Sequence, residues 1–269
     1  MDKYQQANLN LWNERTDIHA ASDAYDLAGF KAGKTQLHAI ELEELGPEVG
    51  GRTMLHLQCH FGRDSMMWAR LGTKVTGVDF SDKSIKLARK LNAELGLDCE
   101  FVQSDVLLLP DHLEGEFDIV FTSYGVLAWL PDIKRWGEVI AHFLKPGGIF
   151  YIVEDHPFAY VFDDAVGQVE LKPRYPYFHQ AEPMEFETEG SYADPDAHVN
   201  QPVKYEWFHP LGDIVSALTS QGLHIEYLHE FNCCSWQMMP VMEKRGEWWY
   251  LPEDMPQIPL TYSIKAIKR

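Results

Sequence analysis

Short apolar runs alternate with amphipathic segments through the middle of the chain. Residues 54–57 form an apolar run that predicts a buried strand, and a glycine-containing turn follows at residues 58–62. A helix-like segment continues to about Leu71, and a second strand over residues 74–78 ends at Asp79. Strand, turn, helix, strand and acid in this order form the first unit of a dinucleotide-type α/β domain.

The same alternation continues beyond Asp79. Ser81 is a predicted N-cap for a helix over residues 83–95, and Pro131 opens another helix before a turn at residues 144–148. Further strands are predicted over residues 99–103, 117–122, 149–153, 223–229 and 259–267. A helix over residues 211–221 precedes the last two strands, which are joined by a loop without a clear crossover helix.

Two segments depart from this pattern. Before the first strand, helical spacing occurs over residues 4–14 and 34–45. Residues 155–207 are rich in proline, acids and aromatic side chains, with apolar–polar alternation at 184–188 and 203–207 that suggests a small antiparallel pair. We interpret this second segment as an inserted cap, and the alternative is a disordered or dimer-forming loop.

The turn at residues 58–62 limits which nucleotide can bind. A pyrophosphate-binding turn needs three glycines, for the bend, for close approach of the phosphates and for helix packing. The matching positions are Gln58, His60 and Gly62, so two of them carry bulky side chains. This argues against NAD or FAD and favours a ribose-bearing ligand without phosphates. Asp79 follows the turn at about the 20-residue spacing of an acid that binds ribose hydroxyls.

Two longer stretches carry a family resemblance. Residues 55–62 read LHLQCHFG, which is similar to the first motif of class I S-adenosylmethionine-dependent methyltransferases, usually a sequence like LDLGCGTG. Residues 117–154 resemble the region from the fourth to the fifth strand of the methyltransferases that act on small molecules. They read FDIVFTSYGVLAWL, then a helical segment, then LKPGGIFYIVE. The resemblance covers about residues 54–154 and again about 211–266.

The resemblance implies an α/β fold, a Rossmann-like sheet of seven mostly parallel strands with an antiparallel last strand, helices on both faces and an inserted cap. It also implies an N-terminal helical lid over residues 1–49 and a methyltransferase domain over residues 50–269, with the cap insertion at 155–207. Trp12 and Tyr25 would line the lid, although plain helix packing explains them equally well.

The implied function is methyl transfer from S-adenosyl-L-methionine to a small-molecule acceptor. In the family, the acid after the second strand, here Asp79, holds the ribose, and the acid after the third, here Asp105, faces the adenine amino group. His56 replaces the motif acid that helps to bind the methionine end. The expected cofactor-binding set is His56, Gln58, His60, Gly62, Asp79, Phe80, Ser104, Asp105, Val106 and Ser123.

A general base is needed only if the acceptor must lose a proton. His156 follows the fifth strand and Tyr124 follows the fourth, so both are candidate catalytic residues at the carboxyl edge of the sheet. Glu154 or Asp155 would orient the imidazole of His156. The alternative is that His156 only hydrogen-bonds the cap.

Charge and composition exclude several partners. The chain of 269 residues has a formal net charge of −18 and no basic run, which disfavours nucleic acids and anionic membranes. The N-terminus lacks an apolar signal core, no apolar stretch reaches the ~20 residues that span a bilayer, and the four cysteines form no C-x-x-C pair. We therefore expect a soluble cytoplasmic protein with a small-molecule substrate and a possible homodimer.

No metal is expected at His56, Cys59 and His60, because strand alternation turns Cys59 away from His56.

Two other functions remain open from the sequence. The unusual residues at positions 56, 58 and 60 also suit a non-catalytic S-adenosylmethionine-binding or regulatory protein with the same fold. A nicotinamide-dependent oxidoreductase is a third possibility, and the bulky Gln58 and His60 count against it.

Overall fold

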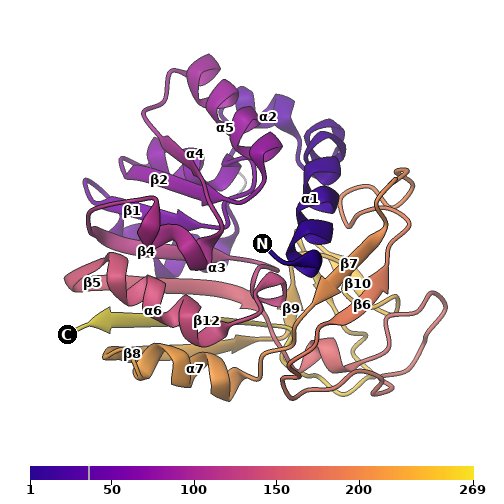
Figure 1. Ribbon diagram of the computed structural model, residues 1–269. Coiled ribbons are helices and arrows are strands. Elements are labelled where there is room, and N and C mark those ends of the chain that lie inside the picture. Colours follow the sequence, from indigo (N-terminus) through magenta and orange to yellow (C-terminus); the bar gives the residue numbers. More distant parts are fainter. Residues whose placement is uncertain (36) are drawn as a thin grey trace.

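A seven-stranded sheet forms the centre of the molecule (Figure 1). The computed structural model describes residues 1–35 and 37–269. The strand order is β3-β2-β1-β4-β5-β12-β8. The strands are β1 (Thr53–Leu57), β2 (Lys74–Asp79), β3 (Glu100–Gln103), β4 (Phe117–Ser123), β5 (Leu144–Asp155), β8 (Leu223–Phe231) and β12 (Thr261–Lys268). β1 to β5 pair in parallel, whereas β12 pairs antiparallel with both β5 and β8, which confirms the predicted fold class.

Helices cover both faces of the sheet because side chains alternate along each strand. On β1, Leu55 and Leu57 join a core that includes side chains of α6 (Ile133–Phe143) and α7 (Leu211–Thr219). Met54 points to the other face and joins a core with side chains of the helices α2 (Leu27–Lys31), α3 (Ala39–Glu44), α4 (Arg63–Arg70) and α5 (Asp82–Leu95). The sheet is therefore buried on both sides, as a parallel sheet requires.

The predicted turn at residues 144–148 lies inside β5 rather than before it. Leu144 already pairs with Phe117, and the next paired residue after the irregularity is Ile149, opposite Ile119. The intervening residues form a bulge, and Gly147 takes the left-handed φ of 77° that glycine accommodates.

The N-terminal helices differ from their predicted ranges. α1 (Lys3–Ala21) begins at an Asp2 capping box and is longer than the predicted 4–14. Only part of the predicted helix over 34–45 forms, as α3, because the His38 amide donates to the Glu41 carboxylate at 2.6 Å and starts the helix there. That predicted range includes Gln36, which lies outside the described residues. α2 was not predicted.

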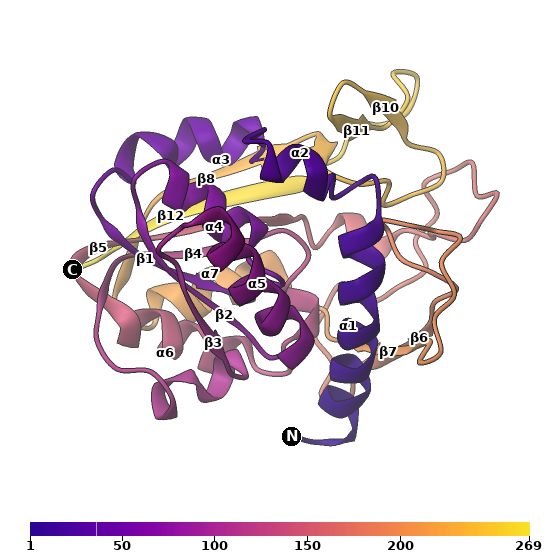
Figure 2. The ribbon, with the colours of Figure 1, turned by 90° about the horizontal axis from the view of Figure 1, so that it is seen from above.

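Two small sheets lie beyond the carboxyl ends of the parallel strands. β6 (Met184–Glu187) and β7 (Val203–Glu206) form the predicted antiparallel pair. β9 (Cys233–Cys234), β10 (Glu243–Arg245) and β11 (Trp248–Tyr250) form a sheet in a region predicted only as a connection. Figures 1 and 2 show α1 standing between the central sheet and the β6–β7 pair. α1 is thus placed where ligands of open α/β sheets bind.

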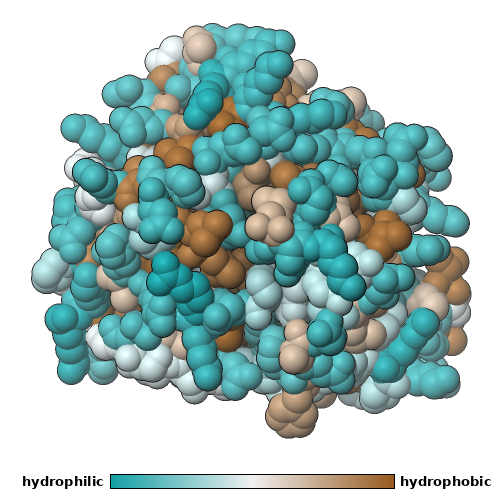
Figure 3. Space-filling model, viewed as in Figure 1, coloured by the Kyte–Doolittle hydropathy of each residue, from teal (hydrophilic) through white to brown (hydrophobic). Residues whose placement is uncertain are grey.

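The surface is mainly hydrophilic on the face shown in Figure 3, where apolar side chains occur in small separate groups. No helix of the described part of the chain is long and apolar enough to cross a membrane.

Candidate active site

The turn between β1 and α4 holds a left-handed backbone at three alternate positions. The φ angles are 56° at Gln58, 52° at His60 and 72° at Gly62. A residue with a Cβ atom pays roughly 1–2 kcal/mol for this conformation. Only Gly62 is also required sterically, because a Cβ there would lie 2.3 Å from a ring carbon of Phe101. The turn therefore has the backbone of a glycine-rich turn, with glycine at only one of these three positions.

Asp79 ends β2 beside this turn, as predicted. The His60 amide donates to one Asp79 carboxylate oxygen at 2.8 Å, and the Ser81 amide donates to the other at 2.9 Å. Burial raises the pKa of Asp79 to about 6. A carboxylate offers about four acceptor positions, so these two bonds leave room for hydroxyl donors.

The two histidines of the first motif are neutral and hydrogen-bonded. Burial lowers the pKa of His56 to about 4, and its ring nitrogens lie 2.8 Å from the Ser65 hydroxyl and 3.4 Å from the Ser123 hydroxyl. The pKa of His60 is also lowered by burial, and its ring contacts Ser84 at 2.9 Å and His19 at 3.0 Å. Neither imidazole supplies the negative charge that the motif acid would bring.

Gln58 provides an acceptor instead. Its amide nitrogen donates to the Val126 carbonyl at 2.9 Å, while its buried Oε1 has no hydrogen-bond partner among the described residues. An unpaired buried acceptor of this kind costs about 1–3 kcal/mol and suits a ligand donor such as an ammonium group.

The residues after β3 lie at the same edge. Asp105 accepts the Leu107 amide at 2.9 Å, which caps the short 3₁₀ helix η2 (Val106–Asp111), and its other oxygen accepts the Gln5 side chain at 2.9 Å. Ser104 is buried, and Val106 belongs to the core on the α6–α7 face. Phe80, between β2 and α5, is partly exposed.

α1 covers this edge through polar contacts. Besides the bond from Gln5 to Asp105, Thr16 contacts Ser84 at 2.7 Å and His19 contacts His60. The buried residues of α1 are Asn8, Leu11, Arg15, Thr16 and His19, so its docked face is mainly polar. A cavity of about 30 Å³ lies to one side of this edge, between the segment after β4 and residues 207–209, and neither Asp79 nor Asp105 lines it.

The two candidate bases already have hydrogen-bond partners. The Tyr124 hydroxyl donates to the Glu41 carboxylate at 2.8 Å. Burial raises the pKa of Glu41 to about 8, and burial together with the nearby Glu41 also raises the pKa of Tyr124. His156 Nε2 lies 3.0 Å from Glu230, and its Nδ1 accepts the Phe158 amide at 3.1 Å. The carboxylate that orients His156 is therefore Glu230, and the expectation of Glu154 or Asp155 was wrong.

Glu154 and Asp155 have other roles. Glu154 accepts the amides of Gly125, Val126 and Leu127 and so fixes the segment that follows β4. Burial, with repulsion from Asp155, raises the pKa of Glu154 to about 7. Asp155 accepts the Tyr160 hydroxyl and the Trp236 indole N–H, both at 2.9 Å. Two adjacent acids ending a buried strand were the available sequence signal for these contacts.

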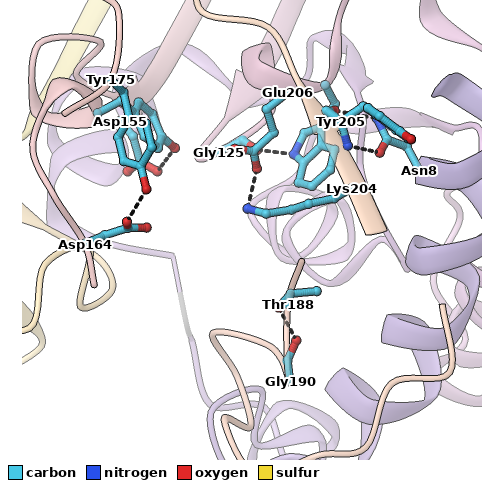
Figure 4. Close-up of polar contacts among 12 residues, drawn as sticks. Asn8, Gly125, Asp155, Asp164, Tyr175, Thr188, Gly190, Lys204, Tyr205 and Glu206 are labelled. Atoms are coloured by element: carbon cyan, nitrogen blue, oxygen red, sulfur yellow. Dashed lines mark hydrogen bonds and ion pairs between the residues drawn. The ribbon is translucent and has the colours of Figure 1, made fainter. Parts of the chain in front are cut away.

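Residues 204–206, in the segment predicted as a cap, add polar groups beside the segment that follows β4 (Figure 4). Lys204 pairs with Glu206 at 2.6 Å, and Asn8 of α1 exchanges two hydrogen bonds with the Tyr205 backbone at 2.7 and 2.8 Å. The Trp129 indole N–H donates to the Gly125 carbonyl at 2.7 Å.

Arg15 of α1 lies next to Trp129 and was not singled out from the sequence. Its guanidinium carbon is 5.3 Å from the Trp12 ring centre and 5.9 Å from that of Trp129. A single arginine in a polar helix carries no local signal that it is buried. For metals, residues 1–35 and 37–269 contain no group of three or more suitable side chains that would hold an ion.

A sequence model described as a methyltransferase domain matches residues 54–148, which span the turn, Asp79 and Asp105. A ubiquinone biosynthesis O-methyltransferase of Bordetella avium strain 197N is 32% identical over 161 residues, which are 55% of this chain and 66% of that protein. A protein of the same name from Caulobacter vibrioides is 37% identical over 102 residues, 38% of this chain and 40% of that protein. The chain thus spans about two fifths to just under two thirds of these relatives.

Solved structures share the fold. An S-adenosylmethionine-dependent methyltransferase from Mesorhizobium loti superposes with a TM-score of 0.58 at 22% identity, covering 85% of this chain and 98% of that one. The glycopeptide N-methyltransferase MtfA, solved with S-adenosyl-L-methionine, gives a TM-score of 0.54 at 17% identity, covering 92% and 98%.

The strand order, the antiparallel last pair and the turn bonded to the acid after β2 define a Rossmann-like nucleoside-binding domain. Together with the matching domain model and relatives, they place the chain in the family of class I S-adenosylmethionine-dependent methyltransferases.

Proposed function

We propose that the protein transfers the methyl group of S-adenosyl-L-methionine to a small-molecule acceptor. The observation that carries this proposal is the direct hydrogen bond from the left-handed turn, at the His60 amide, to the buried Asp79 carboxylate. Such an arrangement presents an acid to a ribose, and the bulky side chains at positions 58 and 60 leave no bare backbone for a diphosphate.

The hydrogen-bond acceptors at the site match the donors of the cofactor. Asp79 would accept the ribose hydroxyls, Asp105 would accept the adenine amino group once Gln5 releases it, and Gln58 Oε1 would accept the methionine ammonium. His56, His60 and Ser123 would shape the site as neutral neighbours, and Gly62 would permit the close turn. The cofactor supplies the reactive methyl group, so the chain has to bind and align the reactants.

We also propose that residues 1–49 act as a lid and residues 155–207 as a cap. α1 bridges the two, since it contacts Asp105 and His60 on one side and Tyr205 of the cap on the other. α1 would lift to admit the cofactor and then close over it.

Cofactor binding can be tested by calorimetry with S-adenosylhomocysteine, the demethylated product. We expect binding by the unmodified protein and a loss of about 1–3 kcal/mol in Asp79→Ala, because ribose hydroxyls would lose their buried acceptor. Asp105→Ala should lose less, since adenine also stacks on apolar neighbours. No binding at millimolar ligand, or unchanged affinity in Asp79→Ala, would overturn the proposal.

Turnover needs a separate measurement. The curated relatives are named O-methyltransferases, so phenols and carboxylic acids should be the first acceptors offered, with S-adenosylhomocysteine formation followed by mass spectrometry. Loss of turnover in Tyr124→Phe or His156→Asn with unchanged cofactor affinity would support a catalytic role for that residue.

A non-catalytic cofactor-binding protein is the second candidate. Both nitrogens of His156 are engaged and Tyr124 donates to Glu41, so neither candidate base is free in the closed arrangement. Cofactor binding without methyl transfer to any acceptor of a broad panel would favour this alternative. We further propose a cytoplasmic location, testable by fractionation, and a possible homodimer, testable by light scattering.

A further inference from the structure

Arg15 is a buried cation without a charged partner. Only 5% of its surface is exposed, and its Nε has no hydrogen-bond partner. Within residues 1–35 and 37–269 the structure gives the Arg15 side chain no hydrogen bond and no ion pair. Burying an uncompensated charge costs several kcal/mol, so an arginine at such a position is expected to pair with something that binds.

The acid that acts on Arg15 through its charge already has a partner. This acid, Glu206, makes its ion pair with Lys204, at 2.6 Å, and not with Arg15. Lys204 itself lies 5.8 Å from the Trp129 ring centre, and Arg15 lies 5.9 Å from it, so two cations adjoin the same indole. Because Glu206 balances Lys204, the Arg15 charge is left over, and such a buried positive charge in a chain with a net charge of −18 points to an anionic ligand.

Two further buried polar atoms, one on α1 and one in the turn that α1 covers, also lack partners. They are Nε2 of His19, one helical turn after Arg15, and Oε1 of Gln58 in the turn beneath. Trp12 connects Arg15 and His19 with the turn that carries Gln58, since its ring contacts Arg15, the His19 ring at 6.0 Å and the His60 ring at 5.3 Å. Unsatisfied groups that gather at one place are typical of a binding site whose ligand completes the hydrogen bonds.

We infer that Arg15 binds a carboxylate group, held against the Trp12 and Trp129 rings when α1 closes. A guanidinium matches a carboxylate through paired N–H donors, and its flat face stacks on indole rings. Two molecules can bring this group: the methionine end of the cofactor, or an acidic methyl acceptor. The inference rests on the proposed function, and the experiment separates the two sources.

The cofactor arm compares S-adenosylhomocysteine with 5′-methylthioadenosine, which lacks the amino-acid end. If the methionine carboxylate binds Arg15, Arg15→Met should weaken S-adenosylhomocysteine at least tenfold and leave 5′-methylthioadenosine unchanged. Arg15→Lys should recover part of the affinity, because it keeps the charge and loses the planar donor pair.

The acceptor arm uses protein saturated with S-adenosylhomocysteine and a panel of aliphatic and aromatic monocarboxylates, each paired with its neutral amide. If the acceptor brings the carboxylate, the acids should bind more tightly than the amides, and Arg15→Met should abolish the preference. The matched control is Arg70→Met, because Arg70 also stacks on a ring, that of Phe30 at 4.5 Å, and also has a buried unpaired nitrogen, yet lies at the far end of α4.

The inference is supported if Arg15→Met weakens S-adenosylhomocysteine binding or abolishes the preference for acids, while Arg70→Met changes neither. Which of the two effects is seen identifies the molecule that brings the carboxylate. If S-adenosylhomocysteine binds normally and neither arm responds to Arg15→Met, the inference is wrong while the proposed function stands. If S-adenosylhomocysteine does not bind the unmodified protein, the proposed function fails first. Circular dichroism of each variant excludes misfolding as the cause of a lost signal.

Discussion

The three residues with a left-handed backbone in the turn after β1 have different structural roles. Gly62 avoids a collision with Phe101, Gln58 fixes the segment after β4 through the Val126 carbonyl, and His60 presents its amide to Asp79. The side chains at positions 58 and 60 therefore add contacts that glycine could not make, in exchange for backbone strain.

This strain predicts an unusual order of stability at position 58. Gln58→Gly and Gln58→Ala both lose the bond to Val126, but only the alanine keeps the left-handed strain. We expect Gln58→Gly to be more stable than Gln58→Ala by about 1 kcal/mol in urea unfolding. At Lys86, inside α5, the order should reverse, because glycine weakens a helix. Equal stability of the two Gln58 variants would show that the turn relaxes.

The raised pKa of Asp79 predicts two effects of pH. Native protein keeps the Asp79 proton up to about pH 6, whereas the unfolded chain releases it near its ordinary value of 3.8. The Asp79 contribution to the free energy of unfolding is therefore largest below pH 3.8 and is lost as the pH rises through about 6. Asp79→Asn should remove this contribution, as measured by urea unfolding at several pH values.

Ligand affinity should change in the opposite direction. Ribose hydroxyls donate to the ionised carboxylate, so affinity for S-adenosylhomocysteine should fall roughly tenfold for each pH unit below about 6 and level off above it. Calorimetry of Asp79→Asn should give weaker binding that does not vary with pH. The same pH dependence in that variant would assign the titration to another group.

At the scale of elements, the strands were the most predictable part. Apolar runs bounded by glycine, proline and acids located every strand of the central sheet. The inner strands are buried on both faces, whereas the edge strands β3 and β8 are partly exposed and were found from their position in the strand–helix alternation. The length of α1 was underestimated because the face that packs on the sheet edge carries the polar residues Asn8, Arg15 and His19. No apolar periodicity therefore marks where the helix ends. β9 to β11 are only two or three residues long, too short for any period to show.

The polar face of α1 predicts how firmly the proposed lid closes. Asn8→Ala removes two hydrogen bonds to the Tyr205 backbone, each worth about 1 kcal/mol. We expect S-adenosylhomocysteine to dissociate about tenfold faster or more in stopped-flow measurements, with little change in global stability. Gln6→Ala is the matched control, because the Gln6 side chain is exposed and, among the described residues, bonds only to Asn10 of the same helix. Equal dissociation rates in both variants would argue against a lid.

At the scale of the whole molecule, the contacts that complete the site join distant parts of the chain. Arg15 meets Trp129, Glu41 meets Tyr124, and Asn8 meets Tyr205. Motif spacing identified Asp79 and its neighbouring turn because these follow one another along the chain. It could not identify partners that only the folded sheet, α1 and the cap bring together.

The net charge of the whole chain predicts different association kinetics for two nearly identical ligands. S-adenosylmethionine carries one net positive charge from its sulfonium, whereas S-adenosylhomocysteine is a neutral zwitterion. The field of a chain with net charge −18 should speed association of the former, and salt should screen this effect. We expect the association rate constant of S-adenosylmethionine to fall as salt rises in stopped-flow traces, while that of S-adenosylhomocysteine stays nearly constant. A parallel fall for both ligands would contradict this expectation.

The hydrogen bonds that hold α1 over the edge of the sheet also have a consequence for the rate-limiting step of the reaction. If α1 is the proposed lid, it opens twice in every cycle, once to admit the cofactor and once to release the product, and each opening moves the helix against the friction of the surrounding water. Turnover with a good acceptor is then expected to slow in proportion to solvent viscosity, when sucrose is added, and to depend little on the nucleophilicity of the acceptor.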